Sequence, residues 1–341
     1  MTKTGTFQTG LGRRDFIRIV ALAGAAGALW HFSPSSRPGS SVTVRRSRAM
    51  MGTQINLIVH GPDPDRCEMA VNATLDRMEL LSGLLSRHDP RSDLSRLNAG
   101  GILRRPGHDL QAVLLQAAGI SRLTDGAFDV TILPLHRLYA ESSGRGSLPR
   151  EEQLSRILSL VDYRRVSVSP ACIEFAEQGM SITLDGIAKG YIVDQGATVL
   201  REMGFNNVYV EAGGDLLAAG SRPGGKPWRI GIRNPRPEMR KDMKVIELTD
   251  RAVATSGDYM QPFSADRLHH HIIDPRSGHS PAALASATVI APTVVLADAL
   301  ATAAMVMGPE KSMDLIASLP GCEGYFIAKD LREFSTPGFF G

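Results

Sequence analysis

Three short stretches of the sequence carry residue types that can perform chemistry, and the first is Leu184-Asp185-Gly186-Ile187-Ala188-Lys189-Gly190-Tyr191. The pattern predicts a strand that ends in a glycine-containing turn and is followed by a helix. A helix N-terminus presents free N–H groups and a positive dipole end, so it favours an anion, and Lys189 adds a positive charge there. The stretch is a candidate phosphate site. The alternative is an ordinary strand–helix turn, and the Walker A pattern is absent.

The second stretch lies on a predicted apolar helix, Leu296–Met307. Asp298 and Thr302 are four residues apart and therefore lie on one face of the helix. A buried carboxylate needs a partner because an unpaired buried charge is costly. Mg²⁺ or Ca²⁺, which prefer oxygen ligands, would be such a partner. The alternative is that Asp298 complements the helix dipole and Thr302 bonds a backbone carbonyl.

The third stretch is His269-His270-His271, which precedes a predicted turn at Asp274–Gly278. Consecutive residues of a strand point to opposite faces, so these three histidines cannot all bind one metal ion. One of them could act as a general base, since imidazole titrates near neutral pH. Two glycine turns, Glu211–Asp215 and Ala254–Tyr259, are weaker candidates. Ser256 does not lie in a GxSxG motif, so a serine hydrolase triad is not supported.

The elements that must position these residues follow from hydrophobic periodicity. Helices are predicted from Pro64, around Leu110–Gly126 and Leu154–Val161, and over Ala188–Met203, Leu296–Met307 and Glu310–Leu319. Strands are predicted at Thr53–His60, Arg165–Val168, Cys172–Phe175, Ser181–Leu184, Val208–Glu211, Trp228–Arg233, Lys244–Leu248, Ala252–Thr255 and Ala287–Ile290. Strands and helices alternate irregularly, which favours a single α+β unit over a regular parallel α/β sheet.

The net charge of the chain lies in its first residues. The 341 residues are 43% hydrophobic and 21% charged, which argues against a disordered chain and a polytopic membrane protein. Residues 1–32 hold four basic residues and one acidic residue, which accounts for the whole net charge of +3. The rest of the chain is neutral, so no dedicated nucleic-acid-binding surface is predicted.

The same segment reads as an export signal. Arg13-Arg14-Asp15-Phe16 precedes a short apolar run, Ile19 to Phe32, that is too short to span a bilayer. Paired arginines before Phe favour a twin-arginine signal peptide over residues 1–32, with an ordinary secretory signal or an uncleaved anchor as the alternatives. A serine- and proline-rich linker is expected at residues 33–45.

In order along the chain, several blocks resemble the ApbE family of FAD:protein FMN transferases. The resemblance extends from about Arg46 to Ile327 and depends on the order of the blocks rather than on any one of them. The blocks are Met51–Thr53, Ser86–Asn98, Gly126–Thr131, Asp185–Tyr191, Glu211–Asp215, Ala254–Tyr259, His271–Gly278 and Val289–Ala303.

This resemblance implies one T-fold-like catalytic domain over residues 46–341, in the periplasm after twin-arginine export. An uncleaved signal would keep it at the inner membrane. It also implies a Mg²⁺-dependent enzyme, for which Ca²⁺ or Mn²⁺ could substitute. The enzyme would split FAD, attach FMN through a phosphodiester to a threonine of a target protein, and release AMP. The alternatives are an FAD pyrophosphatase that produces FMN and AMP, and a non-catalytic flavin-binding maturation factor.

The resemblance also implies roles for individual residues. The metal would be bound by Asp298, Thr302 and the backbone carbonyl of Gly186. Lys189 and the metal held by Asp298 would stabilise charge on the pyrophosphate, and His271 is the candidate general base. The expected flavin- or cofactor-contacting positions are Met51, His88, Ala127, Phe128, Asp129, Asp185, Lys189 and Ile273.

Two positions depart from the family pattern. His88 stands where many members have a tyrosine that stacks on the flavin, and Thr183 stands where many have an aspartate, so Asp185 is the nearest carboxylate. The expected partner is a membrane-anchored redox protein that faces the periplasm and carries an acceptor threonine. Such a protein could belong to a nitrous oxide reduction, sodium-pumping or other electron-transfer complex.

Overall fold

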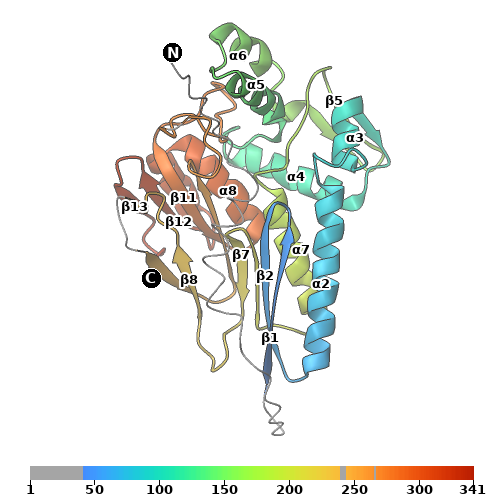
Figure 1. The fold of residues 1–341 in the computed structure, drawn as a ribbon, viewed down its shortest axis with the longest axis vertical. Coiled ribbons are helices and arrows are strands. Elements are labelled where there is room, and N and C mark those ends of the chain that lie inside the picture. Colours follow the sequence, from blue (N-terminus) through green and yellow to red (C-terminus); the bar gives the residue numbers. More distant parts are fainter. Residues whose placement is uncertain (1–40, 239–242, 265) are drawn as a thin grey trace, which may run out of the picture. The chain divides into compact units, whose positions relative to one another are not determined.

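An eight-stranded antiparallel sheet forms the centre of the computed structural model, which describes residues 41–238, 243–264 and 266–341 (Figure 1). Neighbouring strands are antiparallel along the whole sheet. In spatial order the strands are β1 (Val42–Met50), β2 (Thr53–Gly61), β6 (Val208–Ala212), β7 (Asp215–Ala219), β10 (Arg251–Gly257), β11 (Leu284–Ala291), β12 (Glu323–Ala328) and β13 (Glu333–Ser335).

Helices cover one face of this sheet. They are α2 (Pro64–Leu84), α7 (Ala188–Glu202), α8 (Val294–Met307) and α9 (Pro309–Ser318). Strand β2 alternates strictly, so that Ile55, Leu57 and Val59 are buried beneath the helices while the residues between them are less buried. Helix α8 is buried nearly all round because it lies against the sheet and against α7.

A hairpin covers part of the opposite face. It consists of β8 (Trp228–Ile232) and β9 (Lys244–Leu248), and its apolar residues pack in a second core with Leu216, Val253 and Ile290 of the large sheet. Strands β7 and β10 are therefore buried on both faces. This explains why β7 reads as a continuous apolar run rather than an alternating one.

The long connection between β2 and β6 forms the remaining structure. After α2 it contains the three-stranded sheet β3-β5-β4 and several helices (Figure 1). These elements are α3 (Asp93–Gly100), β3 (Ile102–Arg104), α4 (His108–Leu123), η1 (Val130–Ile132), α5 (Leu133–Gly144), α6 (Glu151–Leu158), η2 (Tyr163–Arg165), β4 (Val166–Val168) and β5 (Cys172–Phe175).

The predicted α+β class is confirmed, and residues 41–341 form one unit. One predicted strand is wrong. Residues Ser181–Leu184 are irregular because their backbone groups are bonded elsewhere: the Asn98 side chain bonds both the N–H and the C=O of Ile182, and Thr183 N–H donates to the Val130 carbonyl. Strand β1 begins at Val42, so residues 42 to 45, expected in the linker, belong to the sheet.

The proposed signal peptide, residues 1–32, lies outside the described residues, as does most of the linker. Within the part of the chain that the structure describes, no helix has the length and apolar character that a membrane crossing requires.

Candidate active site

A cavity of about 1050 Å³ opens at one end of the large sheet. Three chain reversals meet there: the β1–β2 turn at Met51 and Gly52, the β6–β7 turn at Gly213 and Gly214, and the end of β10 at Gly257. The first turn of α7, the middle of α8 and the segments around η1 and His271 complete its lining. The cavity is thus built by segments far apart in the sequence.

Every site residue predicted from the sequence lines this cavity. These residues are Met51, His88, Ala127, Phe128, Asp129, Asp185, Gly186, Lys189, His271, Ile273, Asp298 and Thr302. The sequence places them across 252 positions, from 51 to 302. The fold therefore brings all of them to one cavity.

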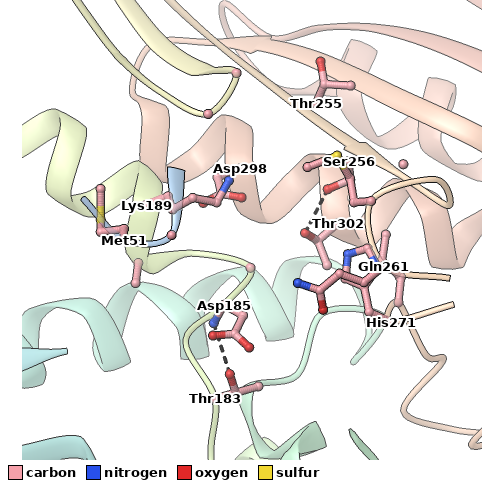
Figure 2. A pocket seen from close by; sticks show the side chains of 18 of the residues that line it. Met51, Thr183, Asp185, Lys189, Thr255, Ser256, Gln261, His271, Asp298 and Thr302 are labelled. Carbon is pink, nitrogen blue, oxygen red and sulfur yellow. Dashed lines mark hydrogen bonds between the residues drawn. The ribbon is translucent and has the colours of Figure 1, made fainter. Parts of the chain in front are cut away.

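Lys189 lies between two buried carboxylates. It forms an ion pair with Asp215, whose side chain is 2% exposed, and Asp298 is buried nearby on α8 (Figure 2). Burial raises the pKa of Asp298, and the neighbouring Asp215 raises it further, while Lys189 opposes both. Burial alone would lower the pKa of Lys189, but Asp215 and Asp298 outweigh that effect and raise it. Lys189 therefore remains a cation at neutral pH.

Segments of two other elements approach the Thr302 side chain. Its hydroxyl lies 3.1 Å from the Ser256 hydroxyl of β10 (Figure 2). A Cβ added to Gly186 would lie 3.1 Å from the Thr302 oxygen and 3.3 Å from the Phe128 ring, so only glycine brings the turn before α7 this close without crowding. One Asp298 oxygen accepts a hydrogen bond of 3.1 Å from Gly190 N–H, and no described residue donates to the other.

This donor set fits a hard divalent cation. Carboxylate, hydroxyl and carbonyl oxygens are the ligands that Mg²⁺ and Ca²⁺ prefer, and a cation would compensate the buried charge of Asp298. Among the described residues there is no group of three or more His, Cys, Asp or Glu side chains that could hold a metal ion. The predicted site has a single carboxylate, and its other donors are neutral oxygens.

His271 reaches the cavity from the segment after the β10 end. Its backbone N–H donates to the Gln261 carbonyl over 3.1 Å, and within the described chain its buried Nδ1 has no hydrogen-bond partner. Burial lowers the pKa of His271 to about 4, and the nearby His136 and His270 add to the effect. The imidazole is therefore neutral at pH 7 and can accept a proton.

The neighbouring histidines do not share this position. His270 is fully buried, and its ring bonds the Pro281 carbonyl over 3.2 Å. Neither His269 nor His270 lines the cavity. His136 of α5 does line it, and sequence reasoning missed this residue because an isolated histidine on a helix carries no motif.

Two of the predicted cofactor contacts have side chains engaged in holding the site together. Asp129 accepts hydrogen bonds from Thr131 N–H and Tyr163 N–H at 2.8 and 2.9 Å, so its carboxylate holds the η1 segment, and burial raises its pKa. Asp185 is exposed and accepts from Arg87 Nε over 3.0 Å, while its backbone N–H donates to the Thr183 hydroxyl. Thr183 thus stabilises the turn that carries Asp185.

The rim of the cavity is more accessible than its floor. His88 is exposed, whereas Ala127, Phe128 and Ile273 are buried. At another part of the lining the Arg233 guanidinium lies over the Tyr259 ring, 5.4 Å from its centre. Asp215, Ser256 and Tyr259 belong to the two glycine turns that are the weaker candidates by sequence, and the fold shows that both turns line the cavity.

Comparison with known proteins agrees with this geometry. A model of the ApbE family matches residues 51–326. The FAD:protein FMN transferase of Treponema pallidum is 29% identical over 313 residues, which cover 86% of both chains. That of Vibrio cholerae is 31% identical over 277 residues, which cover 79% of this chain and 83% of the relative.

Solved structures give the same result. The ApbE protein of Thermotoga maritima superposes with a TM-score of 0.79 at 28% identity, covering 88% of this chain and all of that one. The apo flavinyl transferase ApbE of Pseudomonas stutzeri superposes with a TM-score of 0.74 at 29% identity, covering 88% and 98%. The match in sequence, fold and extent shows that the chain belongs to the ApbE family.

Proposed function

We propose that this protein is a Mg²⁺-dependent FAD:protein FMN transferase, which attaches FMN to a threonine of a target protein and releases AMP. The observation that carries the proposal is the convergence of Lys189, Asp298, Thr302 and His271 on one cavity. At about 1050 Å³ the cavity is slightly larger than the ~300–1000 Å³ typical of ligand sites, as a large dinucleotide requires. The names of the relatives point to the same reaction.

The reaction is a phosphoryl transfer in which one P–O bond replaces another. The threonine oxygen bonds to the phosphorus of the FMN half of FAD, and the bond from that phosphorus to the bridging oxygen breaks, so that AMP leaves. The hydroxyl proton passes to neutral His271, since a free hydroxyl is a weak nucleophile. His271 is suited to this role because its imidazole is deprotonated at pH 7 and faces the cavity.

Lys189 and a cation held by the oxygen ligands would stabilise the negative charge of the pyrophosphate. The Lys189 ammonium is held in place by Asp215, so that it can stabilise charge on the pyrophosphate without having to reorganise. A divalent cation held by Asp298, Thr302 and the Gly186 carbonyl would act as a Lewis acid toward the phosphate oxygens. Ser256, bonded to Thr302, orients that hydroxyl.

The flavin end of the substrate is assigned to the other predicted contacts. Met51, His88, Phe128 and Ile273 offer an apolar or aromatic lining, and the exposed imidazole of His88 can lie against the flavin ring at the rim. An imidazole covers less of the ring than a phenol would, so we expect weaker stacking than in relatives with tyrosine.

One assay tests the proposal against its two alternatives. The purified protein is incubated with FAD, Mg²⁺ and a candidate acceptor, and the products are separated under denaturing conditions. Flavin fluorescence that stays on the acceptor, together with AMP release, is the expected result. Free FMN and AMP without labelled acceptor would indicate a pyrophosphatase, in which water takes the place of threonine. Intact FAD would indicate a binding protein and would overturn the assignment.

The proposal includes where the enzyme acts. The Arg13-Arg14 segment supports export by the twin-arginine route to the periplasm. The acceptor would then be a membrane-anchored redox protein with a threonine exposed on that side, such as a subunit of a nitrous oxide reduction or sodium-pumping complex.

A further inference from the structure

One half-buried carboxylate outside the cavity joins the two helices that carry the predicted metal and phosphate ligands. Asp194 of α7 accepts hydrogen bonds from the backbone N–H groups of Val294 and Val295, each over 2.9 Å. These are the first two residues of α8. Asp194 does not line the cavity, and the mechanism proposed above does not use it.

The two hydrogen bonds to Asp194 take the place of the side-chain cap that the start of α8 lacks. The first N–H groups of a helix have no partner within the helix, and the side chain of the residue before it usually supplies one. Thr293 occupies that position here, but its side chain makes no such bond. Both oxygens of Asp194 serve instead, so the start of α8 is held by a residue of the helix beside it.

Two further contacts fix the same pair of helices. A Cβ at Gly190 would lie 2.6 Å from the Val294 carbonyl oxygen, so the backbones are in close contact one turn before Asp194. Gly190 N–H also donates to Asp298. Asp194 thus lies on the same helix as Lys189, and it holds the end of α8 from which Asp298 and Thr302 follow.

We propose that Asp194 is a positioning residue, which sets the start of α8 against α7 so that Asp298 and Thr302 face Lys189 and Gly186 across the cavity. For flavin transfer, on which this inference rests, the distance between the cation ligands and the lysine decides whether both reach one pyrophosphate. Outer groups that orient metal ligands typically contribute about 10- to 100-fold to metal affinity. Asp194 would act in this way through the helix.

The test measures Mg²⁺ binding by calorimetry and FAD binding by flavin fluorescence, with the purified full-length chain. In Asp194→Ala we expect the Mg²⁺ dissociation constant to rise by about 10- to 100-fold, and FAD affinity in the presence of Mg²⁺ to fall with it. Asp194→Asn keeps one acceptor oxygen and nearly the same shape, so its effect should be smaller and of the same kind. If the alanine variant does not fold, the asparagine variant decides.

Asp63→Ala is the matched control. Asp63 caps α2 with bonds of 2.9 and 3.3 Å to the N–H groups of Asp65 and Arg66, at the end of α2 away from the cavity-lining Ser82. The Asp63→Ala variant should have a lower melting temperature. Its Mg²⁺ dissociation constant should stay within about two-fold of wild type, which is the scatter of such measurements.

Two outcomes would overturn the inference. In the first, both Asp194 variants bind Mg²⁺ as tightly as the Asp63→Ala control does. In the second, the wild-type protein binds no Mg²⁺. A wild type that binds Mg²⁺ and FAD but labels no acceptor would refute the transferase assignment alone, and the binding comparison would still decide the role of Asp194.

Discussion

The environment of His271 differs from that of the two histidines before it. All three have a buried Nδ1 without a partner among the described residues, but only His271 lines the cavity. A base must be neutral and within reach of the proton that it accepts. Residue type alone could not distinguish the three histidines. His271 could be singled out because it lies in the block His271–Gly278 that resembles the family.

We expect His271→Ala to lower the rate of flavin transfer by about 10²- to 10⁴-fold, the usual contribution of a general base. FAD binding should change little, because the imidazole acts on the acceptor hydroxyl. Labelling rates at saturating FAD and acceptor measure this directly. His279→Ala is the control, since His279 is half exposed, pairs with Glu151 and lies outside the cavity. Transfer by His271→Ala within a few-fold of wild type would remove the base assignment.

The lowered pKa of His271 also predicts how stability depends on pH. An unfolded histidine has a pKa of about 6.5, whereas the folded value is about 4, so between these values the unfolded state binds more protons. The free energy of unfolding should therefore decrease as pH falls from about 6.5 toward 4. His136 and His270 face His271 and have lowered pKa values too, while Asp185 acts in the opposite direction.

Comparison with a His271→Gln variant isolates this contribution. Urea unfolding at several pH values should give a shallower decrease for the variant than for wild type, because one imidazole no longer takes up a proton on unfolding. Equal slopes for the two proteins would mean that His271 titrates normally in the folded state.

Spacing within one helix predicted that Asp298 and Thr302, the proposed metal ligands, share a face, because a separation of four residues places two side chains on one side of a helix. The partner of Lys189 could not be found in the same way. Asp215 is 26 positions away, and it meets Lys189 only because β7 lies beneath α7. Local pattern shows which residues share an element, and tertiary packing decides which elements share a site.

At the scale of elements, the close contact of α7 with α8 depends on Gly190. We expect Gly190→Ala to destabilise the protein by about 1–3 kcal/mol, the usual cost of overpacking, because the new methyl would meet backbone atoms of Val294 and Val295 at 2.6 to 2.8 Å. It should weaken FAD binding as well, since α8 would be displaced from Lys189. Urea unfolding and FAD titration are the measurements.

Gly83→Ala in α2 is the control for Gly190→Ala, because the added methyl would meet no neighbouring atoms. Nothing lies within 4 Å of a Cβ at Gly83, and alanine is favoured over glycine in a helix by roughly 0.5–1 kcal/mol. This variant should be as stable as wild type or more so, with unchanged FAD binding. If Gly190→Ala behaved in the same way, the contact would not be as tight as described.

Long periodic elements were predicted well, as were the short strands β4 and β5 and the buried strands β10 and β11, whereas β1 and β7 were missed. The helices α2 and α7 follow their apolar stripes, α8 is apolar nearly all round, and the strands β2 and β6 alternate as expected. Strand β7, buried on both faces, has no alternation to detect. Strand β1 was missed because its exposed arginines, Arg45, Arg46 and Arg48, resemble a solvated segment, and two of them pair with acidic residues of α2.

At the scale of the whole molecule, the net charge lies in residues 1–32, outside the proposed active site. Residues 1–32 contain four of the 38 basic and one of the 35 acidic residues, so the remaining 34 of each sign cancel. A neutral enzyme cannot attract an anionic dinucleotide with a broad positive field. The half-buried Lys189, together with a cation at the proposed oxygen site around Asp298, would therefore supply the attraction locally, where a low dielectric strengthens it.

The charged segment itself predicts how the protein reaches its acceptor. Because the twin-arginine route depends on the guanidinium pair, replacing both Arg13 and Arg14 by lysine keeps the charge and should block export. We expect the variant to accumulate unprocessed in the cytoplasm, with intact FAD:protein transfer after purification, and wild type to appear in the periplasmic fraction. Fractionation with immunodetection measures both, and a host that lacks the twin-arginine translocase serves as the control. Export of the double variant at wild-type level would show that an ordinary secretory route carries the chain.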